Sequence, residues 1–128
     1  MEKAKYDLAK VFKLVDARKI DFSMPNKSLN AVVAVYQDTN KPLNIPQAEE
    51  FICTGIKTLT EKNFAGSQLQ WGSVVVDKYG LVYDSRSWFV KFAIGDDGRL
   101  DEISFHPTKE PMTTLGGIKI PKGVQNEK

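Results

Sequence analysis

The residues best suited to chemistry lie in the last third of the chain, where Phe89, Lys91 and His106 alternate with apolar side chains. Two such alternating runs, residues 88–94 and 99–106, flank a Gly-Asp-Asp-Gly sequence at residues 95–98. Alternation of period two around a turn of this composition predicts an antiparallel β-hairpin. The hairpin would place the only histidine of the chain on a sheet surface.

The register of this hairpin decides which side chains share a face. Pairing the strands symmetrically about Asp96 and Asp97 places Trp88 opposite Phe105, Val90 opposite Ile103 and Phe92 opposite Asp101. The other face then carries the more polar set, which is Ser87, Phe89, Lys91, Glu102, Ser104 and His106. A register slipped by one residue would set Lys91 against Ile103 and mix the faces, so burial disfavours it.

The polar face has the groups needed for chemistry on a phosphate. The reference pKa of histidine suits His106 to act as a general acid or base at neutral pH. Lys91 would stabilise a developing negative charge, with Glu102 as its cross-strand neighbour. Phe89 would offer a stacking platform for a base.

Each of these residues also has a purely structural interpretation. His106 fits a surface histidine bonded to Ser87 or Thr108, and Lys91 with Glu102 fits a solvated ion pair of little energetic value. The C-terminal segment is an equally good partner for the Phe89 ring. These alternatives stay open at the level of the sequence.

Composition excludes several classes of protein. The chain has 128 residues, 41% of them hydrophobic and 27% charged, with a net charge of +2. One histidine and one cysteine, Cys53, cannot form a nitrogen and sulfur metal site, so we expect no metal and no cofactor. Asp96, Asp97 and Asp101 are better explained by a tight turn than by metal binding. We see no signal peptide and no membrane span, which predicts a cytoplasmic protein without a membrane partner.

The order of elements predicts an α+β domain. Apolar residues recur at helical spacing over residues 6–15 and again from Pro46 to Leu59. Residues 28–36 suit a helix capped by Ser28, or a strand, because the segment is rich in β-branched residues. Thr60 is a candidate cap for a short helix before Phe64.

The pattern of the second half of the chain predicts strands. Residues 73–77 and 80–83 have strand character, residues 84–87 form a turn, and residues 118–120 suit a short edge strand. The expected fold is therefore N-terminal helices packed on one face of a C-terminal antiparallel sheet. We expect one domain over residues 1–121 and a disordered tail over residues 122–128.

Several short motifs, in order, resemble a known family. They are a helix of the type Tyr-x-Leu-x-x-Val-x-x-Leu-Val at residues 6–15, the sequence LTEKNFAGS at 59–67, Asp-x-Tyr at 77–79, Phe-Val-Lys at 89–91 and Ile-Ser-Phe at 103–105. Together they resemble the MqsR-type toxins of bacterial toxin–antitoxin systems, which are RelE-like messenger-RNA endonucleases. The resemblance covers residues 5–106 and implies a RelE-like fold and a cognate antitoxin partner.

The chain departs from the family pattern at the expected active-site positions. Gly66 and His106 occupy positions of family lysines, Val76 that of a glutamine, and Phe89 that of a tyrosine. Only His106 replaces a family residue with another group able to transfer protons. Related toxins of the barnase/EndoU/RelE kind use histidine.

Two functions from different classes follow. The leading hypothesis is a metal-independent endoribonuclease toxin in which the ribose 2′-hydroxyl attacks the phosphate, with His106 and Lys91 as catalytic residues. Phe89, Tyr79, Ser104 and Arg86 are its candidate substrate-binding residues. The alternative is a non-enzymatic binding protein of similar fold, either an immunity or antitoxin-like partner or a phage-encoded inhibitor.

Overall fold

The computed structural model describes residues 3–123 and confirms the α+β class. Three helices precede four strands of a five-stranded sheet, whose remaining strand lies between the first two helices, and a two-stranded sheet follows in the chain. The order of strands in the large sheet is β1-β5-β4-β3-β2, antiparallel except for the short parallel pair of β1 with β5.

Each helix begins where its sequence allows. Helix α1, Leu8–Asp16, starts at Asp7, whose carboxylate accepts a hydrogen bond from the Ala9 amide. Helix α3, Ile45–Lys57, starts with a capping box between Asn44 and Gln47. Helix α2, Lys27–Tyr36, follows Asn26, whose side chain makes no capping hydrogen bond, and Ser28, which we expected as the cap, lies within the helix and donates to Glu102.

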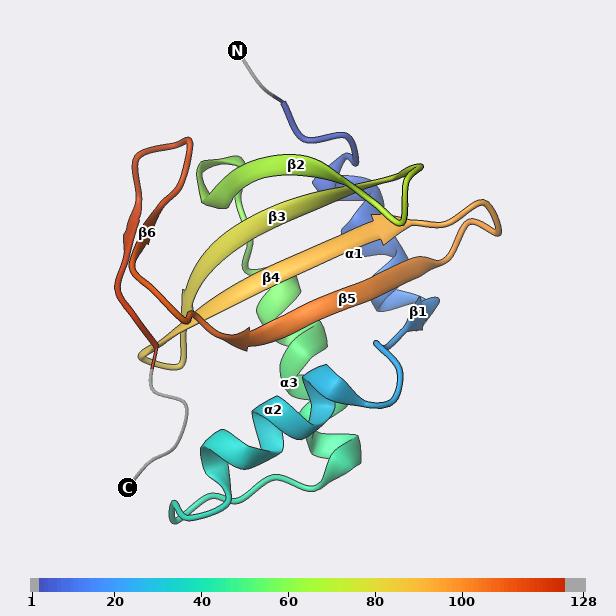
Figure 1. Cartoon of the computed structure of the whole chain (residues 1–128). Coiled ribbons are helices and arrows are strands. Elements are labelled where there is room, and N and C mark those ends of the chain that lie inside the picture. Colours follow the sequence, from blue (N-terminus) through green and yellow to red (C-terminus); the bar gives the residue numbers. More distant parts are fainter. Residues whose placement is uncertain (1–2, 124–128) are drawn as a thin grey trace.

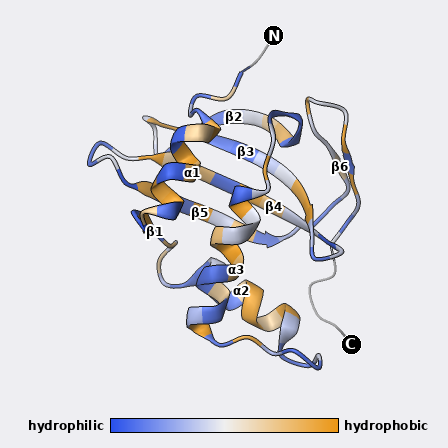
Figure 2. Ribbon diagram, turned by 180° about the vertical axis from the view of Figure 1, so that it is seen from behind, coloured by the Kyte–Doolittle hydropathy of each residue, from blue (hydrophilic) through white to orange (hydrophobic). Residues whose placement is uncertain are grey.

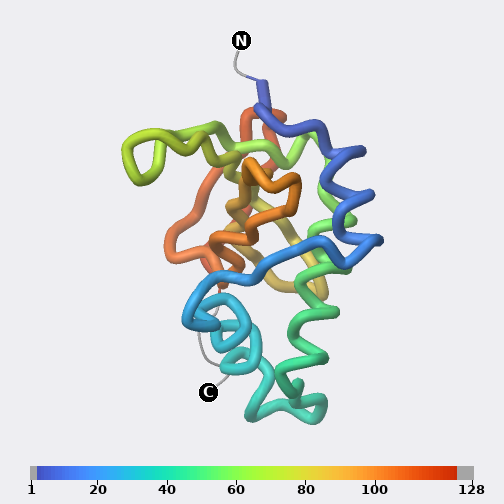
Figure 3. Tube along the Cα trace, turned by 90° about the vertical axis from the view of Figure 1, so that its right-hand side faces the viewer, coloured from blue at the N-terminus to red at the C-terminus, as the bar shows by residue number. Residues whose placement is uncertain are grey.

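The helices are not all in one layer. Figure 1 looks onto the sheet from the side opposite α1 and α3, and Figure 2, seen from behind, has these two helices in front of it. Figure 3 gives the side view, with α1 and α3 along one side of the sheet and the tip of the β2–β3 hairpin curling toward the other. Helix α2 packs mainly against β5 and α3. We call the sheet face toward α3 the inner face and the opposite one the outer face.

The strands differ from the predicted ones in extent. The large sheet consists of β1 (Ile20–Asp21), β2 (Phe64–Gln70), β3 (Val74–Tyr83), β4 (Arg86–Ile94) and β5 (Leu100–Pro107). Strand β3 is continuous where we expected two pieces. Strand β2 was not predicted and follows the short 3₁₀ helix η1, Glu61–Asn63, which Thr60 caps as expected.

The hairpin β4–β5 forms as predicted, but the predicted register was wrong. Next to the turn the strands take the slipped register that we rejected, with Ile94 opposite Leu100 and Phe92 opposite Glu102. A bulge then shifts the pairing by one more residue, so that Lys91 faces Ser104 and Val90 faces Phe105.

The extra residue of this bulge is Ile103, which has no partner in the ladder and is only half-buried. A bulge shifts the alternation of side chains by one residue. Even-numbered residues of β5 therefore lie on the inner face before the bulge, and odd-numbered residues lie there after it. Trp88, Val90 and Phe105 are buried together as expected, whereas Glu102 moves to the inner face.

Phe51 on α3 joins the helices to the inner face. Its ring makes edge contacts with Tyr36, Tyr83, Trp88 and Phe105, at centroid distances of 5.3, 5.0, 5.3 and 6.1 Å. Trp88 and Phe105 are fully buried beneath it. This aromatic cluster holds β4 and β5 in place and thereby fixes the residues on their outer face.

The C-terminal segment forms an arm rather than an edge strand of the large sheet. Strand β6, Met112–Thr113, pairs with β7, Lys119–Ile120. A side chain at Gly80 would come within 2.9 Å of Ile120 and 3.2 Å of Met112, so glycine lets the arm approach β3. Of the predicted disordered tail, Gly123 is buried and its amide donates to the Thr108 carbonyl, and residues 124–128 lie outside the described residues.

No helix within residues 3–123 is both long enough and apolar enough to cross a membrane.

Candidate functional site

The outer face brings together four of the six predicted site residues. Phe89 and His106 are direct cross-strand partners, and so are Lys91 and Ser104 in the next row. All four side chains are half-buried, which leaves each of them accessible from solvent. The structure therefore supports the grouping of His106, Lys91, Phe89 and Ser104 that the alternation predicted.

The imidazole of His106 is held in one orientation. Its ring lies 5.4 Å from the Phe89 ring at an interplanar angle of 35°. Its Nδ1 atom lies 2.8 Å from the Pro107 carbonyl oxygen, which can only accept a hydrogen bond. Nδ1 therefore carries the proton, and in the neutral ring Nε2 is free to accept one.

The electrostatic surroundings keep this ring neutral. Burial lowers the pKa of His106 below its usual value, and the positive charges of Lys109, Lys91 and Lys27 lower it further, against the opposing hydrogen bond to Pro107. At neutral pH the imidazole is thus a base rather than an acid.

Lysines from three elements, β3, β4 and α2, lie close to one another on this side of the sheet. Lys78 on β3 is the cross-strand partner of Lys91, and Lys27 lies at the start of α2. The pKa of Lys91 is lowered, first by partial burial and then by repulsion from Lys78 and Lys27. Such repulsion between cations indicates a surface that an anion would stabilise.

Sequence reasoning missed Lys27, Lys78 and Lys109. Lys78 was detectable in principle, because a continuous strand over residues 74–83 places it on the same face as Gly80, beside Phe89. Lys27 approaches the site only through the packing of α2 against β5, for which the sequence carries no local signal.

Glu102 does not belong to this site, contrary to the prediction. It is 1% exposed on the inner face, where it accepts hydrogen bonds from the Ser28 hydroxyl at 2.6 Å and the Ser23 amide at 3.3 Å. Burial raises its pKa to about 7, although these hydrogen bonds act in the opposite direction. The slipped register next to the turn is the reason, since it pairs Glu102 with Phe92 and turns it away from Lys91.

Tyr79 is also separated from the site. It is 1% exposed on the inner face, with its ring 5.2 Å from Phe92 and 5.5 Å from Phe64. The sheet therefore lies between its hydroxyl and His106. A role for Tyr79 in holding the same phosphate as Lys91 does not fit this geometry.

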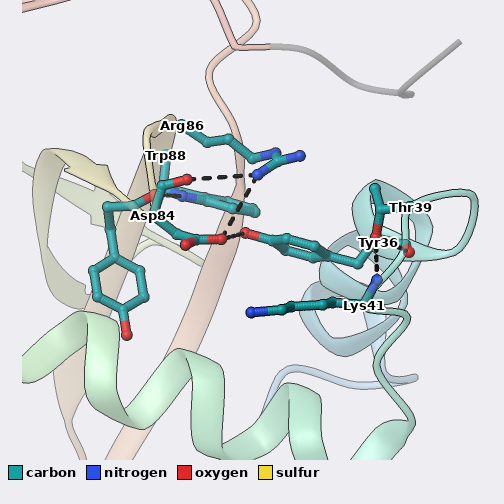
Figure 4. Close-up of polar contacts among 7 residues, drawn as sticks. Tyr36, Thr39, Lys41, Asp84, Arg86 and Trp88 are labelled. Carbon is teal, nitrogen blue, oxygen red and sulfur yellow. Dashed lines mark hydrogen bonds and ion pairs between the residues drawn. The ribbon is translucent and has the colours of Figure 1, made fainter.

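Arg86 points toward the helices at the β3–β4 turn. Its guanidinium carbon lies 4.6 Å from the centre of the Tyr36 ring, and Nη1 lies 3.6 Å from the Asp84 carboxylate. Figure 4 shows Arg86 and the Tyr36 hydroxyl converging on Asp84, with Lys41 extending along the Tyr36 ring. These contacts tie α2 to the hairpin and place Arg86 away from the outer face.

The donor set limits the chemistry of this face. Among residues 3–123, no three or more His, Cys, Asp and Glu side chains gather closely enough to hold a metal ion. What the outer face offers is a neutral imidazole, an adjoining aromatic ring, a hydroxyl and several ammonium groups. This combination suits binding of a phosphate next to a base, with removal of a proton from a nearby hydroxyl.

Comparison with known proteins gives no identity for the chain. Neither a protein-family model nor a curated protein matches it.

Proposed function

We propose that the outer face binds single-stranded RNA and cleaves it without a metal ion. The observation that carries this proposal is the Phe89–His106 ring pair, 5.4 Å between centroids, next to the cross-strand lysines Lys78 and Lys91. A flat aromatic surface suits an unpaired base, and the flanking ammonium groups suit its phosphates.

In this reaction the ribose 2′-hydroxyl attacks the adjacent phosphorus. Nε2 of His106 removes the hydroxyl proton, which its neutral state and fixed tautomer favour. Lys91 stabilises the extra negative charge of the phosphorane. The 5′ oxygen leaves with a proton from water, and the products are a 2′,3′-cyclic phosphate and a 5′-hydroxyl.

A RelE-like toxin assignment accompanies this proposal. Its support is the α+β class, the order of the three helices before strands β2 to β5, and the position of α1 and α3 on one side of the sheet. As a member of such a system, the chain would have a cognate antitoxin that covers the outer face. We regard the cytoplasm as the place where it acts.

RNA binding is tested by reversing one charge on the outer face. Lys91→Glu should lower the affinity for a short single-stranded RNA and reduce the slope of log affinity against log salt by about 1, because one fewer phosphate contact releases one fewer counterion. The matched control is Lys13→Glu, an identical charge change at an exposed position on α1. Equal losses in both variants would show only the effect of net charge and would contradict a localised site.

A second candidate function is non-enzymatic binding of a protein. The observation that favours it is the apolar tip of the β2–β3 hairpin, where Leu69 is 66% and Trp71 is 71% exposed. Exposed tryptophans commonly anchor protein interfaces. Salt-insensitive binding to a protein that Trp71→Ala abolishes, together with no RNA cleavage, would favour this function.

A further inference from the structure

A second concave site lies on the other side of the sheet from His106. It is a cavity of about 630 Å³ between the N-terminal segment, η1 and the loop that carries Leu115. Its lining includes Tyr6, Leu8, Phe64 and Tyr79. Cavities of a few hundred cubic ångströms with mainly apolar walls are typical of small-molecule sites.

The Tyr79 hydroxyl is a buried polar group of this cavity without a hydrogen-bond partner among residues 3–123. The residue is 1% exposed, and no hydrogen bond joins its hydroxyl to any residue in the described part of the chain. Every fully buried side-chain oxygen in the described part of the chain has a hydrogen-bond partner. Because the Tyr79 hydroxyl has none, it must contribute to the small exposed area of this residue. By contrast, the neighbouring Tyr6 hydroxyl already donates to the Val75 carbonyl at 2.6 Å.

The surroundings favour a neutral group at this hydroxyl. Burial raises the pKa of Tyr79, and the negative charges of Asp77 and Glu61 raise it further, so the phenol stays protonated and can donate. The same negative charges would repel an anion. A carbonyl oxygen meets both conditions, because it accepts a hydrogen bond and carries no net charge.

We propose that this cavity binds a small neutral aromatic molecule with a carbonyl acceptor, which takes a hydrogen bond from the Tyr79 hydroxyl. The rings of Phe64 and Tyr79, 5.5 Å apart in an edge contact, supply aromatic walls for such a ligand. Lys3, Lys62, Asp7 and Glu61 also line the cavity, so further polar substituents would meet side chains of both signs.

A pair of probes that differ in the acceptor tests this proposal. Benzamide has a ring and a carbonyl, whereas toluene has only the ring. Two-dimensional amide NMR titrations of the full chain should give saturable shifts near Leu8, Phe64 and Leu115 with both probes. Tyr79→Phe should weaken benzamide binding by about 3–10-fold, the usual worth of one hydrogen bond, and leave toluene binding unchanged.

A second variant tests the location without relying on Tyr79→Phe. Ala4 lines the cavity, so Ala4→Phe should fill part of it and abolish binding of both probes. Three results would each overturn the proposal: absence of saturable shifts in the wild-type chain, unchanged benzamide affinity in Tyr79→Phe, or unchanged binding in Ala4→Phe.

Discussion

The two faces of the sheet carry ionisable groups of opposite sign, and these groups differ in burial and in hydrogen bonding. On the inner face, Asp77 and Glu102 are fully buried and flank Phe92 in neighbouring strands. Asp77 accepts hydrogen bonds from the amides of Lys5 and Tyr6 and from the Ser67 hydroxyl. On the outer face, lysines lie close enough to repel one another.

This difference distinguishes polar groups that stabilise the fold from polar groups that can bind a ligand. Buried carboxylates with several donors stabilise the packing of the first residues and of α2 against the sheet. The outer cations stay half-exposed and gain most from an incoming anion. Because the register next to the turn places Glu102 on the inner face, the cross-strand partners of Lys91 are Lys78 and Ser104, and neither is a carboxylate.

The largest expected effect distinguishes the faces by stability. Phe105 is fully buried on the inner face, so Phe105→Ala should lower the free energy of unfolding by about 3–5 kcal/mol. Phe89 is half-buried on the outer face, and Phe89→Ala should cost about 1 kcal/mol or less. Urea denaturation measures both. Equal losses would mean that the outer face is also core.

The next effect concerns the buried carboxyl group. The pKa of Glu102 is raised from 4.5 to about 7 in the folded chain, so between these pH values the folded state binds more protons than the unfolded state. Glu102 should therefore lower the free energy of unfolding as pH rises from about 4.5 to about 7, by about 3 kcal/mol.

The matched variant is Glu102→Gln, which keeps the shape of the side chain and removes its titration. Its unfolding free energy should lack this decline with pH. His106 has the opposite effect, because its lowered pKa makes stability rise with pH near its usual value of 6.5. Both curves should therefore be measured in a His106→Ala background. Parallel curves would show that Glu102 is not buried as described.

A smaller effect tests whether Arg86 is correctly excluded from the site. Its contacts with Tyr36 and Asp84 are partly exposed, so Arg86→Ala should cost only about 1 kcal/mol of stability. The affinity for RNA should stay within about 2-fold of wild type, because a larger loss of affinity is expected only when a phosphate contact is removed. A loss as large as that of Lys91→Glu would return Arg86 to the binding surface.

Local sequence predicted part of this arrangement well. The alternation over residues 88–94 correctly assigned Trp88 and Val90 to one face and Phe89 and Lys91 to the other. It assigned His106 correctly as well, because the slip at the turn and the bulge add up to a shift of two residues, which restores the predicted face beyond Ile103.

The remainder depends on contacts between distant residues. The hairpin sequence has no feature that predicts a bulge at Ile103. The residues on either side of the bulge make tertiary hydrogen bonds, because the Phe105 amide and the Glu102 carboxyl group both bond to the Ser28 hydroxyl on α2. Strand β2 was missed because Gly66, at a positive φ of 116°, and the polar residues after it lack strand character. Pairing with β3 overrides that weak local preference.

A cleavage assay in excess chelator tests most directly whether the outer face cleaves RNA through His106. The wild-type chain should cut single-stranded RNA to 2′,3′-cyclic phosphate ends, with a rate that rises with pH through the lowered pKa of His106 and levels off by neutral pH. His106→Ala, with unchanged circular dichroism, should be slower by about 100-fold or more. Cleavage that requires added magnesium, or that proceeds equally fast in His106→Ala, would contradict this account.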